Sequence, residues 1–203
     1  MRLFFRQSAV KSPCTCGFCG GIHTAEPFCS DDIMKIIKMN YISHYISPLG
    51  SITLASDGNA LIGLWFDGQK HFGTTLGNEY EEKPLPVFDR TAVWLDIYFS
   101  GGIPDFAPDI HLNDTDFRKD MWDILLTIPY GKTMTYGEIA AMIAHKRGVP
   151  SISAQAIGGA IGRNPISIIV PCHRIMGANE NLTGYAGGIE RKAALLKIEG
   201  ILK

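Results

Sequence analysis

The chain has no apolar run that approaches the ~18–20 residues of a membrane-spanning helix. Its first thirty residues also lack the uninterrupted apolar core of a secretory signal. We therefore expect a cytoplasmic protein that has no membrane partner. Apolar residues make up 46% of the 203 residues, which is enough to bury a core in one large or two small domains.

Cysteine is scarce over most of the chain, because only Cys172 lies beyond the first thirty residues. The others, with His23 among them, suggest zinc, but their Cys-x-Cys-x-x-Cys spacing does not give the paired knuckles of common structural zinc sites. Disulfides would need an oxidising compartment. We expect neither metal nor cofactor, and we interpret residues 1–40 as a disordered or non-native extension, since Met34 and Met39 each precede the first folded-domain pattern and could start translation. The four early cysteines are Cys14, Cys16, Cys19 and Cys29.

The charge of the chain is nearly balanced overall but unevenly distributed. Residues 1–130 contain 10 Lys and Arg against 16 Asp and Glu, whereas residues 131–203 contain 9 against 4. The C-terminal part therefore carries a net charge of +5 and the rest −6. A modestly basic module suits a nucleic-acid ligand, because phosphate neutralisation supplies most sequence-independent affinity. A chance division of charge is the alternative.

The segment from Tyr41 shows short alternating runs separated by turn residues, with Asp57-Gly58 as a hairpin signal. The pattern predicts three antiparallel strands, followed by a helix from about Val87 to Phe99, and hence a small α/β domain over residues 41–112. No motif in this part indicates a catalytic or binding function, so we interpret it as a scaffold. Loop residues between Gly101 and Pro108 precede the expected domain boundary.

The second expected domain, residues 113–203, opens with an amphipathic helix from Phe117 to Thr127. Thr135-Tyr136-Gly137-Glu138 forms a capping box at the start of the next helix, which Gly148 and Pro150 end. Ser151 or Ser153 then caps a helix that begins at Ala154. Two short helices around a turn are typical of a helix-turn-helix, although many proteins with this pattern bind no DNA.

The sequence Ile169-Val-Pro-Cys-His-Arg-Ile175 places a cysteine beside a histidine. The β-branched run Ile166–Val170 predicts a buried strand, which Pro171 would end. Because successive strand residues point to opposite faces, Cys172 and His173 can act together only if the chain turns there or a water bridges them.

The order of several motifs resembles one family. Tyr136, Asn164-Pro165, Pro171-Cys172-His173-Arg174, Tyr185 with Gly187-Gly188, and Lys192 through Glu199-Gly200 follow one another as in the O6-alkylguanine-DNA alkyltransferases, also called methylated-DNA–protein-cysteine methyltransferases. The match extends from about Phe117 to the C-terminus. The resemblance implies a ribonuclease-H-like α/β domain, with an antiparallel sheet plus helix, followed by a mainly α, winged helix-turn-helix-like DNA-binding domain.

The resemblance also implies a catalytic relay around Cys172. A thiolate is a strong nucleophile toward an alkyl carbon, but an ordinary thiol with a pKa near ~8.5 is mostly protonated at neutral pH. In the family, the residue matching Glu199 holds His173, and His173 takes the thiol proton through a water. The matching Asn164 braces the turn beside the cysteine, and the matching Tyr136 contacts the flipped base and its phosphate. Viewed alone, these would be a helix end, a turn residue and a core aromatic.

Contacts with DNA and base are expected along the helix from Ala154 and the loop at Tyr185. The small residues of that helix offer little to hydrogen-bond base edges, and the family places it in the minor groove. Gln155 stands where many members have an arginine that fills the base stack, and Ala186 stands where some have a hydroxyl residue. The residues expected at the DNA or the base are Ala154, Gln155, Gly159, Arg163, Tyr185, Ala186 and Lys192.

We therefore expect a DNA repair protein that flips O6-alkylguanine, and also O4-alkylthymine, from double-stranded DNA and transfers the alkyl group irreversibly to Cys172. Because a thioether is a poor leaving group, each molecule acts once. The expected partner is alkylated duplex DNA and the expected state is a monomer. The alternatives are a cysteine hydrolase, and a lesion sensor or helix-turn-helix regulator without chemistry. Arg174 is expected to hold the turn through an internal salt bridge or hydrogen bonds.

Overall fold

The structure is a computed structural model that describes residues 39–203. These residues belong to one compact unit. The predictions made for Cys14, Cys16, Cys19, Cys29 and His23 lie outside the described residues, as does most of the predicted extension. Every helix in the described part of the chain is too short or too polar to cross a bilayer.

The N-terminal part is a four-stranded sheet with one helix. The strands β1 (Asn40–Ser47), β2 (Gly50–Ser56) and β3 (Leu61–Phe66) form the predicted antiparallel meander. A short fourth strand, β4 (Tyr80–Glu82), pairs in parallel with β1 and gives the order β3-β2-β1-β4. The alternation in the sequence did not reveal β4, because its three residues are all exposed. The sheet is therefore mixed and not purely antiparallel.

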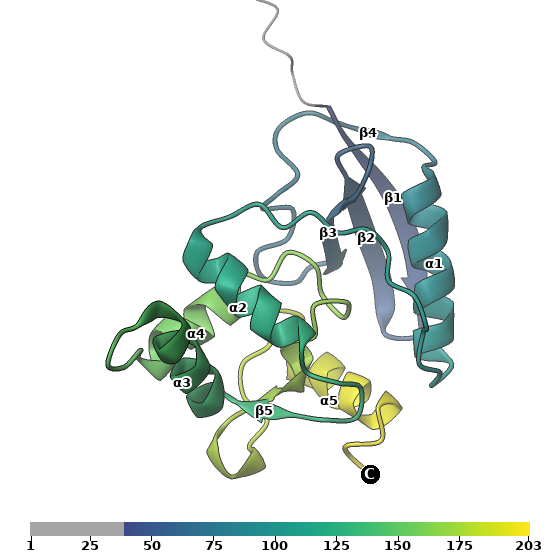
Figure 1. Cartoon of the computed structure of the whole chain (residues 1–203). Helices are drawn as coiled ribbons and strands as arrows, with labels where there is room; N and C mark the ends of the chain where they lie inside the picture. The colour runs from purple at the N-terminus through teal and green to yellow at the C-terminus, as the bar shows by residue number, and fades with distance from the viewer. Residues whose placement is uncertain (1–38) are drawn as a thin grey trace, which may run out of the picture. The chain divides into compact units, whose positions relative to one another are not determined.

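Helix α1 (Pro86–Phe99) packs on one face of the sheet, as Figure 1 shows. Pro86 occupies its first turn, where a missing N–H is tolerated. The opposite face carries a smaller core of Ala55, Ile62 and Trp65, which Leu76 covers from the loop after β3. Apolar cover on both faces explains why every residue of β3 is buried.

The C-terminal part contains helices α2 (Asp116–Leu126), α3 (Tyr136–Arg147), α4 (Ala154–Ile161) and α5 (Ile189–Ile198). Figure 1 shows α2, α3 and α4 grouped together, and the side chains of all three contribute to the main core. The strands β5 (Met134–Thr135) and β6 (Ile175–Met176) pair in parallel and join the start of α3 to the segment that contains Cys172.

Local sequence signals set the ends of α3 and α4 as predicted. Thr135 Oγ1 accepts a hydrogen bond from the Glu138 N–H at 3.2 Å, and the Glu138 carboxylate accepts one from the Thr135 N–H at 2.7 Å. Gly148 ends α3 in the left-handed conformation that glycine adopts without strain. Ser153, one of the two candidates, caps α4 through the Ala156 N–H. The predicted helix-turn-helix is therefore present.

The predicted strand Ile166–Val170 is wrong, because the segment folds as a tight turn. Its Val170 N–H donates to the Ile166 carbonyl at 3.1 Å. Ile168 has a φ of 67°, in the left-handed region that a β-branched residue rarely occupies. β-branched composition therefore marked burial here and not extended backbone.

The edge of β3 that does not pair with β2 holds this turn in place. The Leu64 N–H donates to the Pro165 carbonyl at 2.8 Å, and the Ser167 N–H donates back to the Leu64 carbonyl at 2.9 Å. The N-terminal sheet thus positions the backbone that leads to Cys172. The proposed boundary between domains 41–112 and 113–203 stays a prediction, although the two parts share the main core.

Candidate active site and DNA-contacting surface

Cys172 begins a single 3-10 turn, Cys172–Arg174, and does not follow a strand. The turn satisfies the condition that the chain must bend if Cys172 and His173 are to act together. The thiol is 4% exposed. Among the described residues, no hydrogen bond joins its sulfur to the imidazole of His173.

Asn164 lies against the sulfur and ties the turn together. Its amide nitrogen donates to Cys172 Sγ at 3.1 Å and to the carbonyl of Val170 at 2.8 Å, and its amide oxygen accepts the Ile166 N–H at 3.1 Å. Burial raises the pKa of the Cys172 thiol, and the hydrogen bond from Asn164 and the positive charge of Lys192 oppose that rise. The resting thiol is therefore protonated at neutral pH, and a base must remove its proton.

His173 is completely buried and its Nε2 lies 2.7 Å from Glu199 Oε1. Burial alone would raise the pKa of Glu199, but hydrogen bonds from His173 and Arg174 outweigh it and lower that pKa to about 2. An ionised carboxylate can only accept, so the proton of this hydrogen bond is on Nε2. Burial lowers the pKa of His173, so its ring is neutral at rest and Nδ1 keeps a free lone pair.

Nδ1 of His173 is buried and has no hydrogen-bond partner within residues 39–203. A buried ring nitrogen without a partner is unusual, because buried polar atoms are nearly always bonded to protein or water. The combination of a fixed tautomer and an unbonded Nδ1 leaves this nitrogen able to accept a proton.

Glu199 lies at the end of α5, where it is 5% exposed, and it is not a solvated helix end. Arg174 donates through Nε to Oε2 at 2.9 Å and through Nη2 to Oε1 at 3.0 Å, which confirms its predicted internal salt bridge. The Gly131 N–H adds a bond to Oε2 at 3.2 Å. Both carboxylate oxygens of Glu199 therefore accept hydrogen bonds.

Tyr98 of α1 also reaches Glu199, and sequence reasoning missed it. Its hydroxyl donates to Glu199 Oε1 at 2.9 Å and lies 3.3 Å from His173 Nε2. The signal available in the sequence was an apolar helix with one tyrosine, which predicts only a core aromatic.

A cavity of about 570 Å³ opens between the start of α3, α4 and the loop before α5. The hydroxyl of Tyr136 points to the carbonyl of Gly184 across it at 3.4 Å. Burial raises the pKa of Tyr136, a hydrogen bond from Thr183 opposes this rise, and the charge of a Cys172 thiolate adds to it. The lining residues are Thr135, Tyr136, Gly137, Ala154, Gly158, Ala178, Thr183 and Gly184.

Three residues expected at the DNA lie at the surface of α4. Ala154, Gln155 and Gly159 are all exposed, and the space around an added Cβ at Gly159 is open. Tyr185 places its hydroxyl in the interior, where it lacks a hydrogen-bond partner in the described part of the chain. Ala186 accepts the Lys70 N–H at 3.0 Å through its carbonyl.

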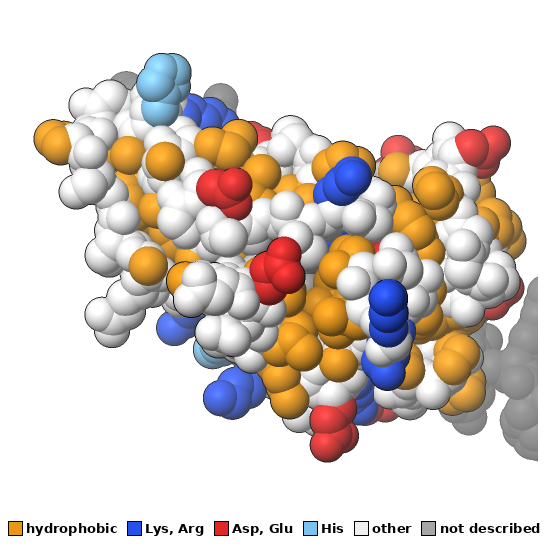
Figure 2. All heavy atoms as spheres, turned by 90° about the horizontal axis from the view of Figure 1, so that it is seen from below, with side chains coloured by type: hydrophobic (Ala, Val, Ile, Leu, Met, Phe, Trp, Pro, Cys, Tyr) orange, Lys and Arg blue, Asp and Glu red, His pale blue; other side chains and the backbone are white. Residues whose placement is uncertain are grey.

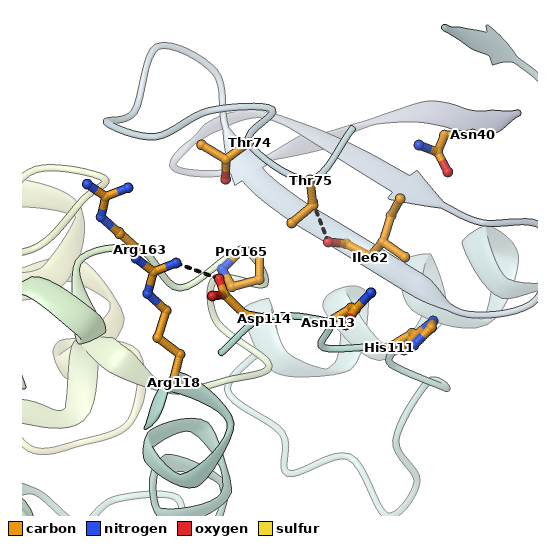
Figure 3. Close-up of a pocket in the computed structure, with 10 residues that line it drawn as sticks. All are labelled: Asn40, Ile62, Thr74, Thr75, His111, Asn113, Asp114, Arg118, Arg163 and Pro165. Carbon is orange, nitrogen blue, oxygen red and sulfur yellow. Dashed lines mark hydrogen bonds and ion pairs between the residues drawn. The ribbon is translucent and has the colours of Figure 1, made fainter. Parts of the chain in front are cut away.

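Arg163 is exposed but lines a different pocket, of about 500 Å³, shown in Figure 3. In that view Arg118 is bound to Asp114, at 2.6 Å, while the guanidinium of Arg163 points away from both. Arg163 is therefore accessible, yet it lies outside the group of residues that surrounds Tyr136.

Lys192 does not occupy the place of a DNA contact, which corrects that expectation. Its side chain is 0% exposed, and its ammonium donates to the carbonyls of Ile175 and Thr183. Burial lowers its pKa to about 8, and the charge of a Cys172 thiolate opposes that shift. Lys192 joins β6 to the loop that lines the cavity and places a positive charge near the sulfur.

Basic side chains are dispersed on the face that Figure 2 shows, which is the view from below Figure 1. Lys and Arg residues there are separated by apolar and uncharged side chains. In residues 39–203, no group of three His, Cys, Asp or Glu side chains is placed to hold a metal ion.

Comparison with known proteins finds matches to both parts of the fold. The ribonuclease-like domain of 6-O-methylguanine DNA methyltransferase matches residues 40–107, and the DNA-binding domain of the same family matches residues 116–201. A methylated-DNA–protein-cysteine methyltransferase of Mycobacterium tuberculosis is 45% identical over 159 residues, which cover 75% of this chain and 88% of that protein. A protein of the same name from Haemophilus influenzae is 37% identical over 162 residues, covering 79% and 87%.

The solved structures include that of Mycobacterium tuberculosis OGT in complex with DNA. It superposes with a TM-score of 0.68 at 42% identity and covers 79% of this chain and 92% of that one. The identity, the coverage and the two matched domains together show that the chain belongs to the methylated-DNA–protein-cysteine methyltransferase family.

Proposed function

We propose that this protein repairs O6-alkylguanine in DNA by transferring the alkyl group to Cys172 in a single turnover. The observation that carries the proposal is the buried Cys172 thiol, with Asn164 on its sulfur and the His173–Glu199 pair on the same turn. Family membership supports the same reaction, because the relatives are named as methyltransferases that act from methylated DNA to a protein cysteine.

The reaction begins with the proton of the Cys172 thiol. His173 Nδ1 takes that proton through a water, and Glu199 stabilises the imidazolium that forms at Nε2. Asn164 and the ammonium of Lys192 stabilise the thiolate. Burial disfavours a resting thiolate, so the proton leaves only as the substrate is engaged.

Alkyl transfer then forms one bond and breaks another. The sulfur lone pair forms the S–C bond to the alkyl carbon, and the electron pair of the C–O6 bond remains on the guanine oxygen. The guanine anion takes up one proton, which balances the proton that the thiol gave to His173. The product thioether has no leaving group of comparable quality, so the protein is consumed.

The cavity at Tyr136 is the proposed site of the flipped base. It lies beside α4, whose exposed Ala154 and Gly159 allow a close approach to a groove. Gln155 would fill the space left in the stack, and Tyr185 with Ala186 would wall the base pocket. Arg163 stays a proposed DNA contact on the grounds of its exposure alone.

The proposed partner is alkylated double-stranded DNA, and the protein is proposed to act as a monomer. DNA-binding is the property of the family, whereas the alkylated state of the DNA follows from the chemistry at Cys172. The absence of a cofactor and the cytoplasmic location stay predictions. O4-alkylthymine is proposed as a second substrate because it also carries an alkyl group on an exocyclic oxygen.

The test is intact-mass measurement after incubation with a duplex that contains O6-methylguanine. We expect a gain of one methyl group per chain, mapped to the peptide that contains Cys172, with unmodified guanine as the other product. Cys172→Ser serves as the control and should gain nothing. A wild-type protein that binds the duplex without a change in mass would instead indicate a lesion sensor.

A further inference from the structure

Tyr98 contacts His173 and Glu199, and packing of α1 on the sheet does not by itself explain this position. It lies on α1, in the part of the chain that was expected to carry no chemistry, and its side chain is 0% exposed. Its ring stacks on Trp94 with centroids 5.4 Å apart and meets the edge of His173 at 6.4 Å. These contacts fix the direction in which the hydroxyl points.

The hydroxyl, the imidazole and the carboxylate form a closed group of three. Tyr98 donates to Glu199 Oε1 at 2.9 Å, His173 Nε2 donates to the same oxygen at 2.7 Å, and the hydroxyl oxygen lies 3.3 Å from Nε2. Since the phenol proton is used on the carboxylate, the phenol oxygen presents a lone pair toward the Nε2–H. A positive charge on the imidazole would therefore meet two acceptors.

We propose that Tyr98 is a positioning residue for the relay base, through which the N-terminal part of the protein controls alkyl transfer. It holds Oε1 of Glu199 in line with Nε2 and supports His173 when the ring takes up the thiol proton. Tyr98 touches neither the base nor the sulfur in this arrangement. The inference rests on the proposed alkyl transfer and extends it to a residue 101 positions from Glu199.

The pH dependence of the alkyl transfer rate can test this role of Tyr98. Burial and the charge of Glu199 raise the pKa of Tyr98 far above its usual range, so the hydroxyl keeps its proton in mildly alkaline solution. Raising the pH increases the fraction of Cys172 that is thiolate, so the path that needs no base grows relative to the relay. The groups that face the hydroxyl are Glu199, His173, Arg174, Tyr130 and Tyr185.

The experiment compares Tyr98→Phe with wild-type protein and with Tyr45→Phe. Tyr45 also gives a hydroxyl hydrogen bond to α1, at 2.7 Å to Asp96, but it has no contact with the relay. The measured quantities are the rate of alkyl transfer from O6-benzylguanine and from duplex DNA between pH 6.5 and 9.5, the affinity for DNA, and the Tm. O6-benzylguanine needs no base flipping, so it isolates the chemical step.

We expect Tyr98→Phe to slow transfer about 10-fold at neutral pH, the order expected when one hydrogen bond to a charged group is lost. The loss should be the same for both substrates and should shrink toward wild type at pH 9.5, while DNA affinity is unchanged. In Glu199→Gln protein the same change should have little further effect, because Tyr98 acts through Glu199. Tyr45→Phe should transfer at the wild-type rate.

Three results would overturn the role of Tyr98. A rate equal to wild type at neutral pH, or a deficit of constant size across the pH range, would make Tyr98 a packing residue only. If Tyr98→Phe does not fold, difluorotyrosine at position 98 keeps the shape and changes the acidity of the hydroxyl, and an unchanged rate at neutral pH would refute the proposal. A wild-type protein that transfers no alkyl group would refute the proposed function itself.

Discussion

The relay around Cys172 and the surface of α4 differ in almost every physical respect. Cys172, His173, Asn164 and Glu199 are at most 5% exposed and are tied by hydrogen bonds that come from several segments. On α4, by contrast, the residues expected at DNA are exposed and mostly small. The proposed chemistry thus depends on a buried network, whereas the proposed DNA contact is a surface with few side chains. Substitutions in the two regions should therefore affect different measurements.

The sharpest test of this separation is Cys172→Ala. Transfer should be abolished, because no other nucleophile stands in the relay, while the affinity for O6-methylguanine duplex should change little. Mass measurement and a binding titration on the same preparation check both statements. Residual methylation of the Ala variant above trace level would place the acceptor elsewhere.

Glu199→Gln should destabilise the protein by on the order of 3 kcal/mol at pH 7, because it leaves the Arg174 charge without its buried partner. The folded-state pKa of Glu199, about 2, lies below the ordinary value of 4.5. Its carboxylate therefore stabilises the fold fully above pH 4.5, and that contribution is lost as the pH falls toward 2.

Denaturant unfolding between pH 2 and pH 7 measures this effect. The wild-type free energy of unfolding should fall across that acidic window more steeply than that of Glu199→Gln. Glu190→Gln, at the exposed start of the same helix, is the control and should stay within about 0.5 kcal/mol of wild type. Identical slopes for wild type and Glu199→Gln would contradict the assigned ion pair.

His173→Ala should slow transfer about 100-fold at neutral pH, the lower range for loss of general base catalysis. The deficit should narrow toward pH 9, because the fraction of thiolate that forms without the base rises with pH. Stopped-flow rates with O6-benzylguanine give this profile. A deficit that is as large at pH 9 as at pH 7 would mean that His173 has no part in proton transfer.

Gln155 belongs to the exposed surface of α4 and not to the buried network. Gln155→Ala should lower repair of duplex DNA by up to about 10-fold, within the few kcal/mol of unstacking a base, and should leave the reaction with O6-benzylguanine unchanged. Gln155→Arg should equal or exceed wild type on duplex, since a guanidinium adds charge and can stack. Equal losses on both substrates would assign Gln155 to the pocket.

The smallest effect is expected from a chain that starts at Met39. Repair activity should be unchanged, because every residue of the relay and of the proposed base site lies in the described residues 39–203. Rate and Tm are compared with those of the full chain, and elemental analysis of the full chain checks for zinc. One zinc per chain that Cys14→Ser removes would contradict this expectation.

Features set by local interactions could be predicted from the sequence. The capping box of Thr135 and Glu138 needs only four consecutive residues, and the end of α3 needs only Gly148. The relay of Cys172, His173 and Glu199 followed from resemblance and not from pattern. The contact of Tyr98 of α1 with Glu199 was not predicted, because the two residues are 101 positions apart.

The errors have a common physical origin in long-range contacts. Ile166–Val170 has the composition of a strand, but side-chain bonds from Asn164 and the backbone pairing of Leu64 with Pro165 fold it into a turn. Lys192 was expected at the DNA or the base, yet carbonyls of two other segments accept hydrogen bonds from its ammonium. The pairing with Leu64 and the acceptors of Lys192 are not visible in a local window of sequence.

The hydrogen bond from Tyr98 to Glu199 joins two positions 101 residues apart, and this separation bears on the order of events in folding. Contacts of such separation form after local helices and turns during folding, because the chain must first close a large loop. The acceptor thiol should therefore gain its reactivity at the end of refolding, when α5 docks, and the rate of reaction with O6-benzylguanine would report completion of the native structure.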